Sequence, residues 1–358
     1  MTEFSCAVKL YAGPDALGAL AKYPARRVLV VTDSYFSKSG LAQRVGERVP
    51  GAEVRVFDRV TPDPPAALAA EGAAVCREFR PELLIALGGG SPMDCAKAIR
   101  LAADLPMTFV AVPTTSGSGS EVTAFSILTH DGVKHPLVDP SLRPDAAILD
   151  DNLLTELPPK LIADTGMDLL AHCLEALAAT NRSGFTDALA SHAAETALRK
   201  LADSYHGDKT VRGELHQAAC MAGMAFDNAG LGLCHAMAHA LGGAFHVPHG
   251  RLCAMLLPHV LDFNQQAALS QYALLARRCG LSAPTERMAL RNLSAAIVRL
   301  RTALQMPSTL SQAGIEGRAV EQASRSIVEA ALADACCKTN PVPVTAQAVE
   351  KILKAVTQ

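Results

Sequence analysis

Several features are missing from this chain of 358 residues, and each absence excludes a class of protein. No run of about 18 apolar residues occurs, so we expect no transmembrane helix. Lysine and arginine total 33 against 35 acidic residues, which gives no basic field for nucleic acid. The start, MTEFSCAVKLYAG, lacks a basic segment followed by an apolar one, so we expect no secretory signal. These absences favour a cytoplasmic globular protein that has neither a membrane nor a nucleic acid as its partner.

Two short motifs are also missing. The ten cysteines form no C-x-x-C pair, and most lie in apolar or helical surroundings, where a free cysteine behaves as a small hydrophobic residue. This favours a reducing compartment. The fingerprint G-x-G-x-x-G is absent, so an ordinary Rossmann motif is excluded.

The hydrophobic pattern predicts two domains, which a chain of this length can accommodate. Up to about residue 155, strand patterns alternate with helix-length segments such as Pro65–Phe79, which predicts a parallel sheet with helices on both faces. An Asp131–Gly132 turn is expected to join two hairpin strands. From 156 to 358 strand patterns stop, and alanine and leucine recur at helical spacing. The expected strands of the parallel sheet lie within 26–33, 52–60, 82–91, 108–120 and 146–150.

Two polar loops follow predicted strands. In the first, Gly88–Ser91, glycines let phosphate oxygens approach the backbone at a helix N-terminus. We expect Ser91 to cap that helix, Pro92 to be its first residue and Asp94 to lie in its first turn. A tight turn is the alternative, but three consecutive glycines exceed what a turn needs.

The second loop, Thr114–Ser120, offers hydroxyl groups to a phosphate or a ribose, although taken alone it is equally typical of a flexible polar loop. Together the two loops indicate a ligand site at the carboxyl edge of the sheet. Asp33 ends a strand, where a carboxylate can bind an adenosine ribose and repel a 2′-phosphate, favouring NAD over NADP. A helix cap is the alternative role for Asp33.

Histidines and one aspartate indicate a metal site. Asp168 and His172 are four residues apart, so they share a helical face. Imidazole and carboxylate ligands suit Fe²⁺ or Zn²⁺. Spacing alone does not decide which histidines bind, and the H-x-x-x-H pair by itself nominates His235 and His239. The segment GLCHAMAHALGGAFHVPHGRL contains four candidates: His235, His239, His246 and His249.

These motifs together resemble the iron-dependent (group III) alcohol dehydrogenase family. The matching segments are GGGSPMDCAKAI, PTTSGSGSEVT, TGMDLLAHCLEA, the stretch from GLCHAMAH to VPHG, and a C-terminal TNP. The family commonly has Asn-Pro-Arg where this chain has Asn340-Pro341-Val342, so any contact of that arginine is in doubt. Within the family the chain is most similar to the propanol dehydrogenases of propanediol-utilisation microcompartments.

The resemblance implies a dehydroquinate synthase-like fold, with an NAD-binding α/β domain over 1–155 and an all-helical metal domain over 156–358. It implies that His239 orients substrate or relays protons and that Asp33 lies by the ribose. The metal ligands it implies are Asp168, His172, His235 and His249. The residues it places at the cofactor are Gly88, Gly89, Gly90 and Ser91 at the pyrophosphate, with Asp94, Thr114, Thr115, Ser118 and Lys134 lining the rest.

The function implied is interconversion of short-chain aldehydes, such as propionaldehyde and acetaldehyde, with primary alcohols. NAD(H) and Fe²⁺, or alternatively Zn²⁺, are the expected cofactors. A homodimer or larger homo-oligomer and association with microcompartment enzymes are also expected. The alternatives are a glycerol-type polyol dehydrogenase, a lactaldehyde (diol) reductase and a non-catalytic assembly component, the last disfavoured because the ligands and glycines are intact.

Overall fold

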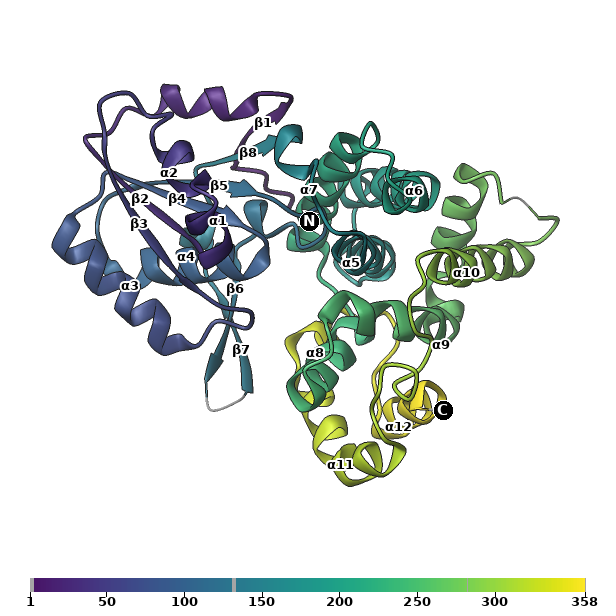
Figure 1. Cartoon of the computed structure of the whole chain (residues 1–358). Helices are drawn as coiled ribbons and strands as arrows, with labels where there is room; N and C mark the ends of the chain where they lie inside the picture. The colour runs from purple at the N-terminus through teal and green to yellow at the C-terminus, as the bar shows by residue number, and fades with distance from the viewer. Residues whose placement is uncertain (1–2, 131–132, 282, 358) are drawn as a thin grey trace. The chain divides into compact units, whose positions relative to one another are not determined.

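The computed structural model describes residues 3–130, 133–281 and 283–357. They divide into two compact units (Figure 1). One unit runs from Cys6 to Leu157, and the other begins at Pro158 and also includes Glu3–Ser5. Within the described ranges, no helix has both the length and the apolar character needed to cross a bilayer.

The first unit is built on a six-stranded sheet in which all neighbouring strands are parallel. The order is β1-β8-β5-β4-β2-β3, so the direction of progress across the sheet reverses between β2 and β4. Open parallel sheets bind ligands at such a reversal, beyond the carboxyl ends of the strands. The strands are β1 (Lys9–Gly13), β2 (Arg27–Asp33), β3 (Glu53–Val60), β4 (Leu83–Gly88), β5 (Thr108–Pro113) and β8 (Ala146–Asp150).

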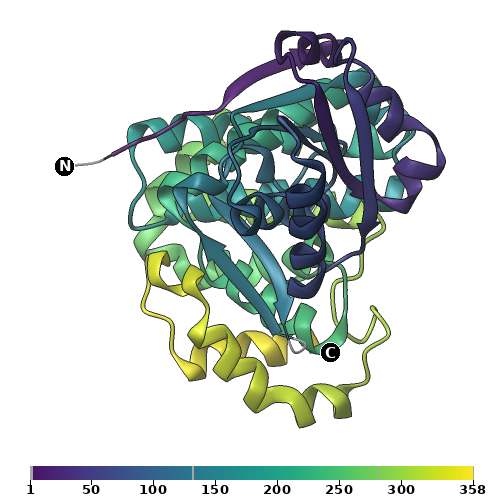
Figure 2. The ribbon, with the colours of Figure 1, turned by 90° about the vertical axis from the view of Figure 1, so that its left-hand side faces the viewer.

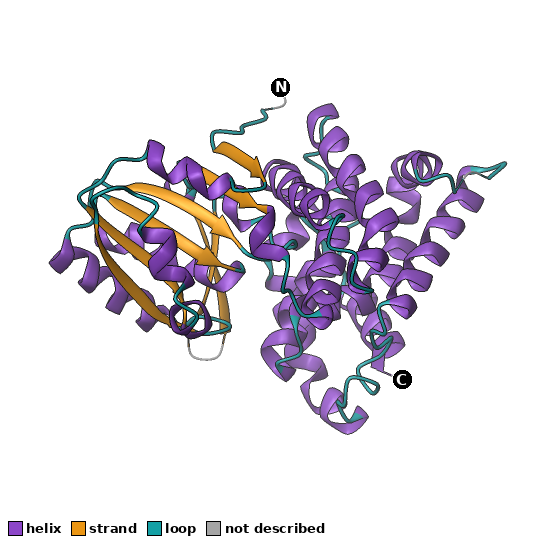
Figure 3. Ribbon diagram, turned by 45° about the horizontal axis from the view of Figure 1, so that its top comes forward, coloured by secondary structure: helices purple, strands orange, loops and turns teal. Residues whose placement is uncertain are grey.

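Helices flank the sheet (Figure 3). Residues of η1 and α2 share a core with alternate side chains of β4, Leu83, Ile85 and Leu87. The side chains between these point to the other face, and α4 contacts β4 and β2. The parallel sheet with flanking helices is therefore confirmed. The helical elements of this unit are η1 (Ala16–Lys22), α1 (Ser34–Lys38), α2 (Leu41–Gly46), α3 (Ala66–Phe79), α4 (Gly90–Ala103), η2 (Ser120–Val122), η3 (Pro140–Leu142) and η4 (Asp151–Leu154).

Two strands lie outside the parallel sheet. β6 (Phe125–His130) and β7 (Val133–Val138) pair antiparallel and form the ribbon visible in blue-teal in Figure 2. The two hairpin strands were predicted, whereas the Asp131–Gly132 turn lies outside the described residues. β1 was not predicted, because this edge strand alternates between exposed and half-buried residues and lacks a buried apolar run.

The start of α4 differs from the prediction. The helix begins at Gly90 with Gly89 as its N-cap, so Ser91 and Pro92 lie inside the first turn and Asp94 lies beyond it. Gly88 causes this early start, because its φ of 144° turns the chain directly into the helix. A Cβ on Gly88 would lie 2.5 Å from Cγ of Pro92, so only glycine fits there. The N-cap residue, Gly89, makes no side-chain hydrogen bond to α4. The prediction that Ser91 caps this helix was therefore wrong.

Every regular element described in the second unit is helical, as predicted. α5 is buried from Gly166 onward and contacts α6, α7 and α9. The metal-type residues of α5 therefore lie in the interior of this unit. The elements are α5 (Pro159–Ala178), α6 (Gly184–Tyr205), α7 (Arg212–Ala229), α8 (Leu233–Phe245), α9 (His249–Arg278), α10 (Glu286–Ala303), α11 (Gly317–Ala333), η5 (Ala335–Thr339) and α12 (Ala346–Thr357).

Candidate metal centre and nucleotide site

One face of α5 carries three polar side chains in an otherwise apolar interior. Asp168, His172 and Glu175 occupy positions i, i+4 and i+7, which a helix of 3.6 residues per turn places on one face. All three are buried, with at most 9% of their surface exposed. Buried polar groups at this density require partners, and other helices of the same unit provide them.

Three imidazoles converge on one oxygen of Asp168. The distances from Oδ1 of Asp168 to the Nε2 atoms are 3.9 Å for His172, 3.6 Å for His235 and 3.4 Å for His249. His235 lies in the first turn of α8, and His249 is the first residue of α9. The rings of His172 and His235 stack with centroids 4.5 Å apart. The four residues named as ligands from the resemblance thus come together.

The chemistry of this group fits a divalent metal. Nε2 of His235 is buried and makes no hydrogen bond, which is costly unless a ligand occupies its lone pair. Burial raises the pKa of Asp168, but the imidazoles of His172, His249 and His235 outweigh this and hold that pKa well below its ordinary value. An ionised carboxylate with three imidazoles is a donor set that Fe²⁺ and Zn²⁺ accept.

Cys253 lies beside this cluster, and sequence reasoning did not single it out. Its Sγ is 3.6 Å from Nε2 of His249 and 3.7 Å from Oδ1 of Asp168. Burial raises the pKa of the Cys253 thiol well above its ordinary value. Cys253 therefore lies within reach of the same site, whereas the family resemblance implies the three imidazoles and the carboxylate as the ligands.

Gly250 brings α9 close enough to α5 for His249 to reach Asp168. A Cβ at position 250 would lie 1.8 Å from the backbone oxygen of Asp164, so no side chain fits. Beside it, the guanidinium of Arg251 donates to the Asp164 carboxylate at 2.8 and 3.1 Å. A glycine and an ion pair therefore fix the start of α9 against α5.

Glu175 holds the N-terminus of α8 in place of a local cap. Its Oε1 accepts from the N–H of Cys234 at 2.6 Å, and its Oε2 lies 2.5 Å from Nδ1 of His235. Asn340 completes this arrangement, because its Oδ1 accepts from the N–H of Leu233 at 3.1 Å. The carboxylate thus fixes the His235 tautomer with the proton on Nδ1 and Nε2 free for a metal. Glu175 was not predicted from the sequence, although its i+7 spacing from Asp168 indicates that both residues share one face of the helix.

His239 lies apart from the Asp168 oxygen despite its H-x-x-x-H spacing with His235. Its Nδ1 is 2.8 Å from Oδ2 of Asp334, and its ring stacks on that of His249 at 5.1 Å. Burial raises the pKa of Asp334, but the hydrogen bond and charge of His239 outweigh it and bring that pKa to about 2. An ionised Asp334 therefore orients the His239 ring.

The two polar loops of the first unit lie against each other. A Cβ on Gly89 would lie 3.2 Å from Oγ1 of Thr115, and one on Gly90 would lie 3.5 Å from Cβ of Ser118. The N–H of Thr114 donates to the oxygen of Gly88 at 2.9 Å. Since Gly88 ends β4, this double loop lies at the carboxyl end of a strand next to the reversal point of the sheet.

Asp94 and Lys97 support the second loop from α4. The Ser120 hydroxyl donates to Oδ1 of Asp94 at 2.9 Å and accepts from Nζ of Lys97 at 3.0 Å. Burial raises the pKa of Asp94 to about 6, and the charge of Lys97 opposes this. Lys97 is fully buried and was missed by sequence reasoning, which treated it only as part of a matching segment.

Asp33 and Lys134 have partners of their own. Oδ1 of Asp33 accepts from the N–H groups of Tyr35 and Phe36 at 2.9 and 3.2 Å, so Asp33 caps α1. Its position at the carboxyl end of β2 leaves it next to the reversal point. Lys134, on β7, pairs with Asp63 at 2.7 Å.

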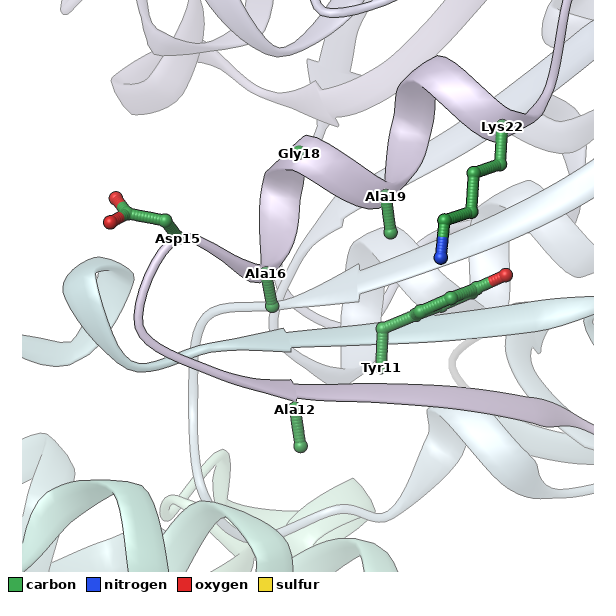
Figure 4. Close-up of a pocket in the computed structure, with 7 residues that line it drawn as sticks. All are labelled: Tyr11, Ala12, Asp15, Ala16, Gly18, Ala19 and Lys22. Atoms are coloured by element: carbon green, nitrogen blue, oxygen red, sulfur yellow. The ribbon is translucent and has the colours of Figure 1, made fainter.

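A shallow pocket of about 330 Å³ lies elsewhere in the first unit (Figure 4). The side chains of Tyr11 and Lys22 meet in it, and Nζ of Lys22 lies 4.8 Å from the centre of the Tyr11 ring. None of the site residues predicted from sequence lines this pocket, so it carries no part of the site. Its lining is Tyr11, Ala12, Asp15, Ala16, Gly18, Ala19 and Lys22.

Comparison with known proteins agrees with this geometry. The family model for iron-containing alcohol dehydrogenases matches residues 7–151. A second family model, for the C-terminal region of the Fe-containing alcohol dehydrogenases, matches residues 162–357. The chain belongs to this family. It is an oxidoreductase of the alcohol dehydrogenase type, acting on alcohols and aldehydes, and the family is a metal-binding one.

Individual relatives match almost end to end. The chain is 39% identical to the 1-propanol dehydrogenase PduQ of Salmonella typhimurium, with 99% of each chain covered. It is 37% identical to the NADPH-dependent butanol dehydrogenase of Clostridium saccharobutylicum, covering 99% of this chain and 98% of that one. The solved structure of an iron-containing alcohol dehydrogenase from Thermococcus thioreducens matches with a TM-score of 0.92, 31% identity and 99% of each chain covered.

Proposed function

We propose that the protein interconverts short-chain aldehydes, such as propionaldehyde and acetaldehyde, with primary alcohols by using NAD(H). The observation that carries the proposal is the convergence of three imidazoles on Asp168, with Nε2 of His235 buried and without a hydrogen bond. We assign residues 1–155 to NAD binding and 156–358 to the metal and catalysis. A homo-oligomer, a cytoplasmic location and association with microcompartment enzymes remain predictions of the sequence resemblance.

The residues that would hold the metal are Asp168, His172, His235 and His249. When bound, Fe²⁺ or Zn²⁺ would supply a Lewis acid that polarises a carbonyl or alcohol oxygen. The protein side contributes one negative charge and three neutral imidazoles, so the occupied site keeps a net charge of +1 and favours an alkoxide. Glu175 keeps the proton of His235 on Nδ1, so Nε2 of His235 stays unprotonated and can bind the metal.

The residues that would hold the dinucleotide are those of the double loop. Gly88, Gly89, Gly90 and Ser91 would take the pyrophosphate at the uncapped start of α4, where backbone N–H groups and the helix dipole favour an anion. When bound, NAD(H) would supply the hydride or accept it. Further contacts are proposed for Asp94, Thr114, Thr115, Ser118 and Lys134.

We assign the proton transfer of the reaction to His239. Asp334 stays ionised at neutral pH, because its pKa is about 2, and it holds the proton of His239 on Nδ1. Nε2 is then the nitrogen that exchanges a proton with the alcohol or its alkoxide. This orientation by a carboxylate gives His239 a role separate from metal binding.

The test of the proposed activity is NADH oxidation with propionaldehyde. The metal-free protein is reconstituted anaerobically with Fe²⁺ or with Zn²⁺, and turnover is followed at equal loading. Turnover that depends on added metal is expected. Intact NADH binding without turnover on any short aldehyde would reject the proposed substrate, and glycerol-type polyols and lactaldehyde would then be assayed.

Replacing His239 by alanine is expected to lower kcat about 10²–10⁴-fold, the usual contribution of a general acid or base. Metal content, measured by elemental analysis, is expected to stay at the wild-type level, because Oδ1 of Asp168 has three other imidazoles within 3.9 Å. His192→Ala, on the exposed side of α6, is the matched control and should behave as wild type. Loss of metal in His239→Ala would show that this imidazole is a ligand.

Replacing Asp33 by asparagine is expected to reduce the discrimination against NADPH by roughly tenfold, equivalent to about 1.4 kcal/mol. Asparagine caps a helix about as well as aspartate, so the bonds to Tyr35 and Phe36 persist while the charge that repels a 2′-phosphate is lost. Dissociation constants for NADH and NADPH measure the change. An unchanged ratio of the two dissociation constants would mean that Asp33 only caps α1. NADPH use would then be compatible with this chain, as it is in the Clostridium relative, which is named NADPH-dependent.

A further inference from the structure

A second group of side chains that could bind a metal ion consists of His239, Asp334 and Cys336. One donor atom of each residue lies within 4.8 Å of the other two. Asp334 stands between its partners, because its Oδ2 is 2.8 Å from Nδ1 of His239 and its Oδ1 accepts from the N–H of Cys336 at 2.8 Å. The three residues come from α8, the end of α11 and η5. They share no donor with the cluster around Asp168.

We propose that these three side chains bind a second divalent cation of the zinc type, and that this ion inhibits the enzyme. The inhibitory part rests on the proposed role of His239 in proton transfer, whereas the binding site itself does not. The cation is accessible from solvent, since the side chains of His239 and Asp334 keep 18% and 16% of their surface exposed.

The donor set determines the class of ion. An imidazole, a carboxylate and a thiolate are ligands that Zn²⁺ accepts together, whereas Mg²⁺ and Ca²⁺ require oxygen ligands. Zinc bonds of about 2.0–2.3 Å place tetrahedral ligands roughly 3.3–3.8 Å apart, which the observed cluster reaches through small side-chain rotations. The two anionic ligands neutralise the ion, so no net charge is left in this half-buried position.

Binding has a defined proton balance. The thiol of Cys336 loses one proton to solvent as its sulfur bonds to the metal. The metal takes the place of the proton between His239 and Asp334, and that proton moves from Nδ1 to Nε2 of the imidazole. A neutral His239 with its proton on Nε2 can no longer accept one from an alcohol, which is the physical reason for inhibition.

The test uses Co²⁺ as a spectroscopic substitute for zinc in the iron-loaded protein. Co²⁺ bound to a thiolate gives a charge-transfer band in the near ultraviolet, whereas carboxylate and imidazole ligands, such as those of the Asp168 cluster, give none. We expect one further equivalent of Co²⁺ per chain, accompanied by this band. Cys336→Ser should lose both, and Cys337→Ser, the adjacent residue, should keep both.

Two results would overturn the site. One is wild-type protein that takes up no further equivalent. The other is a band that survives in Cys336→Ser and disappears in Cys253→Ser, which would assign the thiolate to the cysteine beside Asp168. Both readouts are independent of substrate, so they stand even if the proposed aldehydes are not turned over.

Inhibition is measured separately. Zn²⁺ added to the iron-loaded enzyme is expected to inhibit NAD⁺-dependent alcohol oxidation, and Cys336→Ser should raise the half-inhibiting concentration at least about tenfold, since one of three protein ligands is lost. Equal inhibition of Cys336→Ser and wild type would show that zinc acts elsewhere and would reject the inhibitory role.

Discussion

Replacing Glu175 by glutamine is expected to lower the affinity for the catalytic metal about 10–100-fold, the usual effect of losing a residue that orients a metal ligand. Glutamine has the shape of glutamate but only one acceptor oxygen. The backbone N–H of Cys234 can only donate a hydrogen bond, so the glutamine oxygen is expected to face it. The NH₂ group then faces His235 and forces the imidazole proton from Nδ1 to Nε2, the atom that should bind the metal.

The measurement for Glu175→Gln is metal retention against a chelator of graded strength, together with activity at saturating metal. Activity should recover partly when metal is added in excess, which distinguishes weak binding from a lost fold. Glu214→Gln, on an exposed part of α7, is the control that should match wild type. Retention equal to wild type would mean that Glu175 serves only as a cap for α8.

Replacing Lys97 by methionine is expected to destabilise the first unit by about 3–5 kcal/mol, the range for breaking a buried charged network by removing one partner. The three N–H groups of the ammonium are shared among four acceptor oxygens at 2.7–3.1 Å, and methionine fills the space without donating to any of them. A loss of this size is a large part of the total stability of a domain. The acceptors are Oγ of Ser120, the backbone oxygen and Oγ1 of Thr123, and the backbone oxygen of Phe125.

The stability of Lys97→Met is measured by urea unfolding, with NADH binding followed in the same samples. Affinity for NADH should fall as well, because Ser120 is the last residue of the second loop of the proposed cofactor site and Thr123 lies shortly after it. Lys38→Met, an exposed residue of α1, is the matched control and should lie within about 0.5 kcal/mol of wild type. A normal unfolding midpoint for Lys97→Met would show that the hydrogen bonds of this ammonium group contribute little.

Local periodicity accounts for the parts of the fold that the sequence predicts. Four strands carry long runs of buried apolar residues, and α5 repeats its polar positions at helical spacing, so both can be recognised within a short window. The start of α4 depended instead on the backbone of Gly88, which no capping preference describes. β1 was missed because an edge strand has too few buried residues to give a pattern.

The candidate site shows the same division. Spacing placed Asp168 and His172 on one face, but it favoured His239 over His249, since the His249 position depends on a turn and on a close helix contact at Gly250. Resemblance to a family, not physics, named His249 in advance. The roles of Glu175 and Asn340 depend on contacts across 59 and 107 residues of sequence, which local patterns do not encode.

The shared cap of α8 also has a consequence for how the protein acquires its metal during synthesis. Asp168 and His172 leave the ribosome before His235, yet the N–H of Leu233 gains its acceptor only when Asn340, 107 residues further along, has been made. The segment that carries His235 is therefore expected to reach its final geometry only after residue 340 has been synthesised. A nascent chain that ends before residue 340 is expected to hold iron poorly.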